Sequence, residues 1–260
     1  MGLFVFDLDG TLIDHTYKLQ KEEIEALNLL YQNGHQICFC SGRPYAGIRA
    51  ILNEANFDKF SYIISSNGGI ITDSSGSIVF EKYLGSAAFF DVFDEFGDDE
   101  DLTILCYSNN KIGYVNHYEI IHLEELSNRI DSFKMSREYL DPLIKIMIRT
   151  GDKDAYKIAV PQRLLDEYEV AVTNYHWIEF NVKGINKGNA IDYVRNLLNV
   201  DSKNVYFFGD SGNDLEGIKK FNGVAMGNAD EEVKKHAKYV TKSIYEHGVP
   251  YALKEILKVI

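Results

Sequence analysis

Cysteine, proline and tryptophan are scarce in this chain of 260 residues, which has three, four and one of them, respectively. The cysteines are odd in number and lie inside strand-like runs at no regular spacing, so a disulfide framework is excluded. We expect them to be buried, reduced thiols, which behave as small apolar side chains. Reduced thiols predict a cytoplasmic protein.

Long apolar runs and basic residues are also in short supply. No apolar stretch reaches the roughly 18 residues of a membrane span, and no basic segment precedes the first strand-like run. We therefore expect neither a membrane contact nor a secretory signal. Lys and Arg number 27 against 39 Asp and Glu, and the net charge of -12 argues against nucleic acid as a partner, which requires a basic face.

Two apolar runs, one near each end of the chain, lead into aspartates. The first is followed by Asp7 and Asp9, and the second by Asp210 and Asp214. Continuous apolar runs are typical of strands buried on both faces of a parallel sheet, and ligands bind at the carboxyl ends of such strands. The sequence therefore predicts that the four carboxylates face one crevice.

This acidic group predicts a metal-dependent reaction. Close carboxylates raise one another's pKa, so they require a cation or a shared proton, and an all-oxygen set suits Mg²⁺. With its charge neutralised, Asp7 can attack phosphorus and form an aspartyl-phosphate. Asp9 would then protonate the leaving oxygen and later activate the hydrolytic water, serving first as acid and then as base.

Candidate phosphate donors lie between the two acidic segments. Ser41 with the following backbone amides, and Lys187 at a predicted helix start, can stabilise charge on phosphate oxygens. Two structural alternatives remain open: Ser41 could cap the helix after it, and Asp214 could be a capping acid of its own helix. Arg43 and Asn67 either reach the substrate or brace loops.

The order of the predicted elements indicates an α/β fold. Strands alternate with helices through the first part of the chain, as in a doubly wound, Rossmann-like parallel sheet. The expected strands are 3–6, 36–40, 62–65 and 205–208, the expected helices 22–33, 44–54 and 187–198, and 70–72 with 78–81 is expected to form a hairpin.

A different pattern interrupts this fold from about Ser86. This pattern predicts a helix, paired short strands, a further helix, a strand at 144–149, a helical stretch broken near Pro161, and strands at 170–173 and 177–180. Such an α+β pattern predicts a separate inserted domain. We place the core domain at 1–84 and 183–260 and the inserted domain at 85–182, with connecting segments at 84–85 and 181–184.

Four short segments together resemble the signature motifs of the haloacid dehalogenase (HAD) superfamily. They are Phe6-Asp7-Leu8-Asp9-Gly10-Thr11, Ser41-Gly42-Arg43, Asn186-Lys187-Gly188 and Gly209-Asp210-Ser211-Gly212-Asn213-Asp214. The insertion resembles a type IIB cap, as in the Cof-like sugar phosphatases. The resemblance implies that Mg²⁺ is held by Asp7, the Asp9 main-chain carbonyl and Asp210, with Asp214 as a supporting ligand. It also implies phosphate contacts from Leu8, Ser41, Gly42, Lys187 and Asn213.

The motifs and the charge pattern together predict a magnesium-dependent phosphatase. Its expected substrate is a small phosphorylated metabolite of the sugar phosphate class. Two alternatives remain: a phosphomutase of the same superfamily, which returns the phosphoryl group to the sugar, and a non-catalytic regulatory protein that accepts phosphate. The oligomeric state is not predicted by the sequence.

Overall fold

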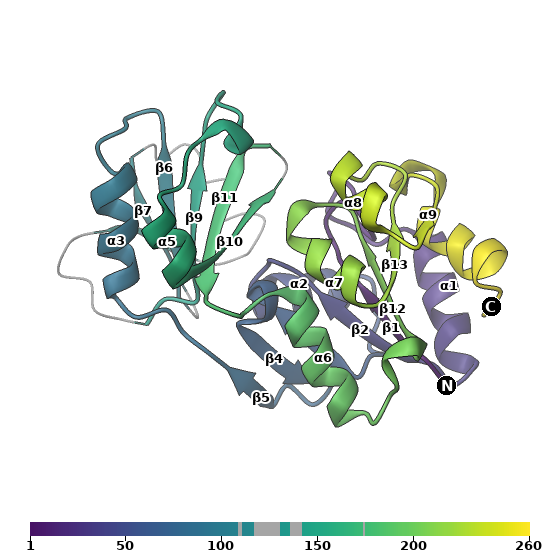
Figure 1. Cartoon of the computed structure of the whole chain (residues 1–260). Coiled ribbons are helices and arrows are strands. Elements are labelled where there is room, and N and C mark those ends of the chain that lie inside the picture. Colours follow the sequence, from purple (N-terminus) through teal and green to yellow (C-terminus); the bar gives the residue numbers. More distant parts are fainter. Residues whose placement is uncertain (109–110, 117–130, 136–141, 174) are drawn as a thin grey trace. The chain divides into compact units, whose positions relative to one another are not determined.

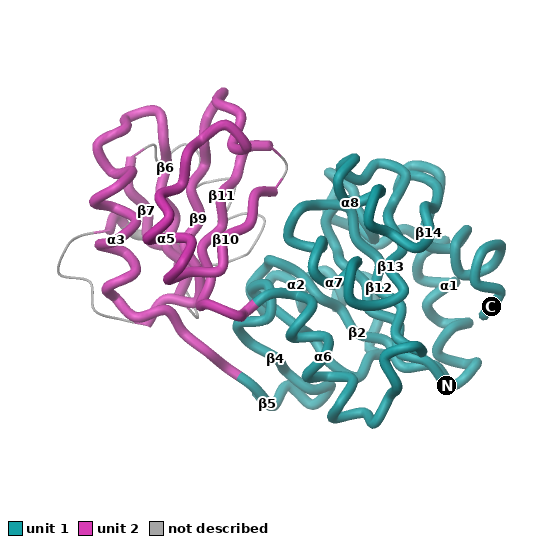
Figure 2. The backbone as a smooth tube through the Cα atoms, viewed as in Figure 1, with its two compact units in different colours: residues 1–80, 186–260 teal, residues 81–185 magenta. Residues whose placement is uncertain are grey.

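A computed structural model divides the chain into two compact units (Figures 1 and 2). Unit 1 comprises 1–80 and 186–260, and unit 2 comprises 81–185. The structure describes residues 1–108, 111–116, 131–135, 142–173 and 175–260. Among these residues, no helix is long and apolar enough to span a membrane.

Unit 1 is built on an eight-stranded sheet in the order β14-β13-β12-β1-β2-β3-β4-β5. The pairings from β14 to β3 are parallel, and β3 pairs with β4 antiparallel. All four residues of the first strand are fully buried, as expected for a central strand covered on both faces. The strands are β1 (Leu3–Phe6), β2 (Gln36–Cys40), β3 (Tyr62–Ser65), β4 (Ile70–Asp73), β5 (Ile78–Glu81), β12 (Val205–Gly209), β13 (Asn222–Ala225) and β14 (Tyr239–Val240).

Helices connect these strands. From β1 the chain crosses over through α1 to β2, and from β12 it crosses in the opposite direction through α7 to β13, so strand order reverses beside β1. In parallel sheets this reversal point is where ligands bind. The helices are α1 (Lys21–Gln32), α2 (Tyr45–Glu54), α6 (Lys187–Leu197), α7 (Leu215–Lys220), α8 (Glu231–His236) and α9 (Gly248–Tyr251), with short 3-10 turns at 66–68, 202–204, 212–214 and 244–246 and a π-helical turn at 252–256.

Unit 2 contains a second, mainly antiparallel sheet in the order β10-β11-β9-β6-β7-β8. One set of its apolar side chains forms a core with α3, including Ile104, Ile146 and Phe180. The elements are α3 (Ala87–Phe96), β6 (Thr103–Tyr107), β7 (Lys111–Val115), β8 (Asp131–Lys134), β9 (Lys145–Arg149), α5 (Gln162–Glu167), β10 (Tyr168–Thr173) and β11 (Trp177–Val182), with a 3-10 turn at 155–157. The helix that the sequence predicts between the paired strands and β9 lies outside the described residues.

The two sheets confirm the predicted fold class of an α/β core with an α+β insertion. One detail differs from the sequence prediction. Asn181 and Val182, expected in a connecting segment, pair with Glu169 and Tyr168 and so extend β11 by two residues. This pairing follows from β10, which begins at Tyr168 instead of Val170.

Candidate active site

Two adjacent central strands carry the first and last predicted acidic segments. Phe6 of β1 pairs with Phe208 of β12 in parallel register, and the backbone N–H of Asp7 donates to the carbonyl of Phe208 across 3.0 Å. The residues that follow both strands therefore emerge side by side at the carboxyl edge of the sheet. Asp7 and Asp210 are brought together in this way.

Three aspartates form a buried cluster at this edge. One carboxylate oxygen from each of Asp7, Asp210 and Asp214 lies within 4.8 Å of the others. The three residues are 4%, 8% and 0% exposed, respectively. Asp214 is fixed by its own loop, because its Oδ2 accepts the backbone N–H groups of Asp210 (2.9 Å) and Ser211 (3.0 Å). The predicted capping role of Asp214 is therefore present together with its place in the cluster.

Lys187, the first residue of α6, supplies an ammonium group to this cluster. Its Nζ donates to Asp7 Oδ1 at 2.7 Å and to Asp214 Oδ1 at 2.6 Å, and its side chain is fully buried. A buried lysine is stable only when its charge is compensated. Lys187 thus joins the loops after β1 and β12 through their acidic side chains.

The protonation of the cluster reflects its burial. Burial raises the pKa of Asp7 to about 8, with Lys187 opposing and Asp214 and Asp9 adding to the rise. Burial, followed by the charges of Asp7 and Asp214, also raises the pKa of Asp210 well above its ordinary value. For Lys187, burial alone would lower the pKa, but the charges of Asp214 and Asp7 outweigh it and hold that pKa well above the usual range. The single ammonium group of Lys187 therefore cannot neutralise all three carboxylates of the cluster.

Gly10 lets the first loop approach Asp210. Its φ is +81°, a conformation that L side chains rarely adopt, and a Cβ at this position would lie 2.2 Å from Asp210 Oδ2. The next residue, Thr11, donates from Oγ1 to Asp210 Oδ1 at 3.3 Å. Thr11 ends the first motif segment, but no role was predicted for it from the sequence. Its place directly after the Asp-x-Asp-Gly segment is the signal that could have identified it.

Asp9 is held by Arg43 and lies apart from the three-carboxylate cluster. The guanidinium donates from Nε to Asp9 Oδ2 and from Nη2 to Asp9 Oδ1, both at 2.7 Å. Two parallel bonds of this kind fix a carboxylate in orientation as well as position. The other side of Arg43 faces the Tyr17 ring, whose centroid is 4.9 Å from the guanidinium carbon. Arg43 thus contacts one of the two predicted catalytic carboxylates.

A hydrogen-bonded network links the remaining polar candidates. Ser41, buried after β2, accepts the backbone N–H of Arg43 at its Oγ across 3.2 Å, and its carbonyl accepts the N–H of Asn67 across 3.0 Å. The Asn67 side-chain oxygen in turn accepts from Asn213 Nδ2 at 3.0 Å. Ser41, Arg43, Asn67 and Asn213 are therefore coupled although they come from the segments after three strands, β2, β3 and β12.

The last two predicted phosphate contacts, Leu8 and Gly42, lie in the segments that follow β1 and β2. Leu8 is fully buried between Asp7 and Asp9, and Gly42 is half-buried between Ser41 and Arg43. Their predicted contribution is through the backbone. An additional residue, Asn228, supports the first loop by donating from Nδ2 to the Gly10 carbonyl at 2.8 Å while its Oδ1 accepts the N–H of Ile244.

The donor set at the cluster fits a hard divalent cation. It consists of carboxylate oxygens, which are the protein ligands that Mg²⁺ prefers. Burial raises the pKa of both Asp7 and Asp210, so a bound cation would favour their ionised forms. Asp7, Asp210 and Asp214 are the side chains that could hold such an ion.

Comparison with known proteins agrees with this arrangement. A family model for haloacid dehalogenase-like hydrolases matches residues 4–253. The Bacillus subtilis phosphatase YwpJ is 26% identical over 301 residues, covering 99% of this chain and 100% of YwpJ. The Bacillus subtilis 5-amino-6-(5-phospho-D-ribitylamino)uracil phosphatase YwtE is 24% identical over 290 residues, covering 99% and 98% of the two chains.

A solved structure shares the whole fold. The HAD subclass IIB sugar phosphatase BT4131 matches with a TM-score of 0.83 at 22% sequence identity, over 100% of both chains. The family match spans nearly the full length of the sequence and includes every segment that contributes to the acidic cluster. The chain therefore belongs to the haloacid dehalogenase-like hydrolases.

Proposed function

We propose that this protein is a magnesium-dependent phosphatase that hydrolyses a small phosphorylated metabolite through an aspartyl-phosphate on Asp7. The observation that carries the proposal is the buried cluster of Asp7, Asp210 and Asp214 around Lys187 at the carboxyl edge of β1 and β12. Mg²⁺ bound by these carboxylates would supply the positive charge that lets a phosphate dianion approach an anionic nucleophile.

In the first step, an Asp7 carboxylate oxygen forms a bond to phosphorus while the bond from phosphorus to the ester oxygen breaks. The leaving oxygen takes a proton from Asp9, and the alcohol departs. In the second step, water attacks the aspartyl-phosphate and gives its proton to Asp9, releasing inorganic phosphate and restoring the Asp7 carboxylate. Both steps use Asp9, and the bidentate contact with Arg43 supports a role for Arg43 in positioning it.

The transferred phosphoryl group needs fixed donors. Lys187 is already held against Asp7 by a 2.7 Å hydrogen bond, so a phosphoryl group on Asp7 would lie beside its ammonium. We propose that Ser41, the amide of Gly42 and Asn213 complete the phosphate contacts. The network that links Ser41 to Asn213 through Asn67 supports their acting together.

We further propose that unit 2 acts as a cap that selects the leaving group, and that the substrate is a phosphorylated sugar or sugar derivative. The name of the relative YwtE, a phosphatase of a phosphoribityl compound, supports this substrate class. Closure of a cap would also exclude bulk water while the phosphoryl group is transferred from the ester to Asp7, before the hydrolytic water attacks.

The test is release of inorganic phosphate from a panel of phosphorylated sugars, sugar alcohols and nucleotides, with and without Mg²⁺. We expect multiple turnover that stops in excess chelator and in Asp7→Asn, whereas the exposed acid Asp58 can be changed to Asn without loss. An isomerised sugar phosphate with little free phosphate would identify a phosphomutase. Phosphorylation without turnover would identify a regulatory protein.

A further inference from the structure

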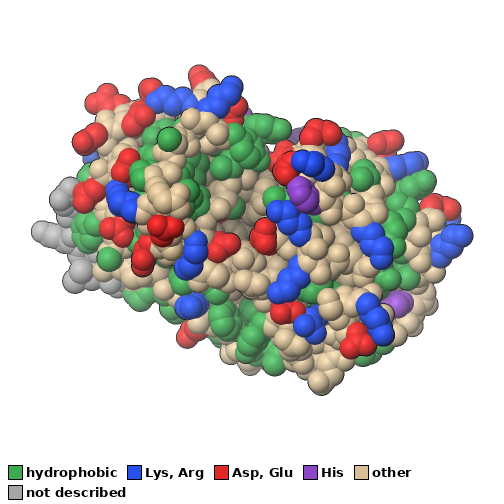
Figure 3. Space-filling model, viewed as in Figure 1, with side chains coloured by type: hydrophobic (Ala, Val, Ile, Leu, Met, Phe, Trp, Pro, Cys, Tyr) green, Lys and Arg blue, Asp and Glu red, His purple; other side chains and the backbone are tan. Residues whose placement is uncertain are grey.

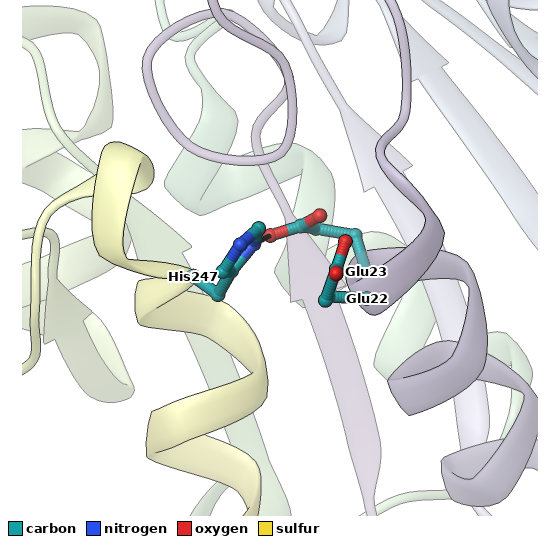
Figure 4. Close-up of side chains that lie close together, drawn as sticks. All are labelled: Glu22, Glu23 and His247. Atoms are coloured by element: carbon teal, nitrogen blue, oxygen red, sulfur yellow. Dashed lines mark hydrogen bonds and ion pairs between the residues drawn. The ribbon is translucent and has the colours of Figure 1, made fainter.

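A second group of potential metal ligands lies in unit 1, built from residues that the proposed hydrolysis does not use. Glu22 and Glu23 belong to the first turn of α1, and His247 directly precedes α9. One ligand atom from each lies within 4.8 Å of the others. Figure 4 shows the three side chains converging from these two elements.

The buried member of the group is incompletely paired. Glu23 is 2% exposed, and its Oε1 lies 3.0 Å from Nδ1 of His247. Its Oε2 is also buried, yet it has no hydrogen-bond partner among the described residues. A buried carboxylate oxygen without a partner costs free energy, so such atoms are normally satisfied by a donor or by an ion. This orphan oxygen is an observation separate from the clustering of the three residues.

The types of ligand indicate which ion would fit. One imidazole nitrogen and carboxylate oxygens form a mixed set typical of Zn²⁺ and related transition metals, whereas Mg²⁺ prefers oxygen alone. Glu22 is exposed and the His247 side chain is 42% exposed, so an ion could enter from solvent. The all-carboxylate cluster of Asp7, Asp210 and Asp214 is different in kind and in position along the chain.

We propose that Glu22, Glu23 and His247 bind a transition-metal ion of the Zn²⁺ type, which ties α1 to the C-terminal segment. Binding uses the Nδ1 lone pair of neutral His247, so the proton that Nδ1 shares with Glu23 leaves that nitrogen and the imidazole carries its single proton on Nε2 instead. The ion would also pair the orphan oxygen of Glu23. Its role is structural, since the three residues join two elements that already pack together, α1 and α9.

The test is calorimetric titration of Zn²⁺ into the full-length protein in excess Mg²⁺, which occupies oxygen-only sites, at mildly alkaline pH where imidazole is neutral. We expect one Zn²⁺ site per chain in the wild type and in Asp210→Asn. In His247→Asn the site should vanish, and Glu22→Gln should lower the Zn²⁺ affinity about ten-fold or more, as loss of metal-site contacts does.

These variants are chosen to fold. His247 has a φ of 54°, a left-handed conformation that asparagine tolerates, and Glu22 is exposed. His236→Asn is the matched control, because His236 also lies beside a glutamate, Glu232, at 3.4 Å. It should bind Zn²⁺ like the wild type, and Zn²⁺ should raise the melting temperature of both.

Two results would overturn the proposal. One is the absence of a Zn²⁺ site in the wild type under these conditions. The other is a Zn²⁺ site that disappears in Asp210→Asn but persists in His247→Asn, which would assign it to the catalytic carboxylates. Phosphatase activity does not enter either readout, so failure of the proposed hydrolysis would leave this test unaffected.

Discussion

Lys187 and Asp214 form an ion pair, 2.6 Å from Nζ to Oδ1, in which neither side chain is exposed to solvent. The pair joins the start of α6 to the loop after β12, and the same ammonium bonds to Asp7. Breaking a buried pair by removing one partner leaves an uncompensated charge. The stability of the site and its chemistry therefore depend on the same lysine.

Lys187→Met should destabilise the metal-free protein by about 3–5 kcal/mol, because Asp7 and Asp214 lose their cation. Urea unfolding in chelator measures this change. Lys203→Met is the control, since Lys203 is 78% exposed and its loss should cost no more than about 0.5 kcal/mol. Adding Asp214→Asn to Lys187→Met should cost less than the sum of the single changes. Additivity within about 0.5 kcal/mol would show that the two residues are not coupled.

Arg43→Lys should lower kcat with little change in KM, because lysine cannot reproduce the two parallel bonds to Asp9. We expect a fall of at least about ten-fold, toward the 10²–10⁴-fold that a general acid–base group contributes. Steady-state kinetics on the best substrate measures both parameters. Arg49→Lys is a control in the following helix, where Arg49 donates to Asn53. A raised KM with unchanged kcat would instead assign Arg43 to phosphate binding.

Gly10→Ala should abolish activity and weaken binding of Mg²⁺, because the new methyl group would collide with Asp210 Oδ2 at 2.2 Å. Gly34→Ala is the control that measures only the free-energy cost of placing alanine at a positive φ. Gly34 has nearly the same φ, +79°, but no atom lies within 4 Å of an added Cβ. That control should lose only about 1–2 kcal/mol of stability and keep its activity. Equal losses of activity in both variants would refute the steric explanation.

The three cysteines should be unreactive in the native protein. All are buried and free, and burial raises the pKa of Cys38 to about 12 and the pKa of Cys40 and Cys106 well above the ordinary range. The thiolate is the reactive form, so an aromatic disulfide reagent should label them only after unfolding. Rapid labelling of a native thiol would contradict their placement.

The distribution of charged side chains over the surface agrees with the excess of acidic residues in the sequence. On the face shown in Figure 3, acidic and basic side chains of the described residues are interspersed over both units, without a continuous basic stripe. Because the net charge is -12, the protein as a whole would not attract a phosphate ester, so a bound cation would have to supply positive charge locally.

The sequence was sufficient for the core sheet and for bringing Asp7, Asp210 and Asp214 to one edge, because both depend on local patterns. It also predicted the Asp9 carboxylate in this group, whereas the structure holds that carboxylate against Arg43. Four consecutive apolar residues, Leu3–Phe6, followed by a turn signal favour a strand covered on both faces, and aspartates that follow neighbouring parallel strands lie at the same edge of the sheet. The contact of Arg43 with Asp9 could not be predicted, because the direction of a long side chain is decided by packing around it.

Other features could not be predicted from the sequence, because they depend on contacts that form only in the folded protein. His247 and Glu23 are separated by 224 positions and match no ligand spacing, so only the packing of α9 on α1 brings them together. The extension of β11 to Val182 likewise depends on its partner β10 and not on the residues alone. Long-range pairing overrides the local signals that mark the ends of elements.

The most direct test of the account is to trap the covalent intermediate. The protein is mixed with its best phosphate ester and Mg²⁺, quenched rapidly in acid and examined by peptide mass spectrometry. We expect a phosphoryl group on the peptide that contains Asp7 and none in Asp7→Asn. With p-nitrophenyl phosphate, whose leaving group needs no acid, the group should persist longer in Asp9→Asn, because the hydrolytic step lacks its base. Turnover with no phosphoryl group on Asp7, or with one on a different residue, would contradict the mechanism.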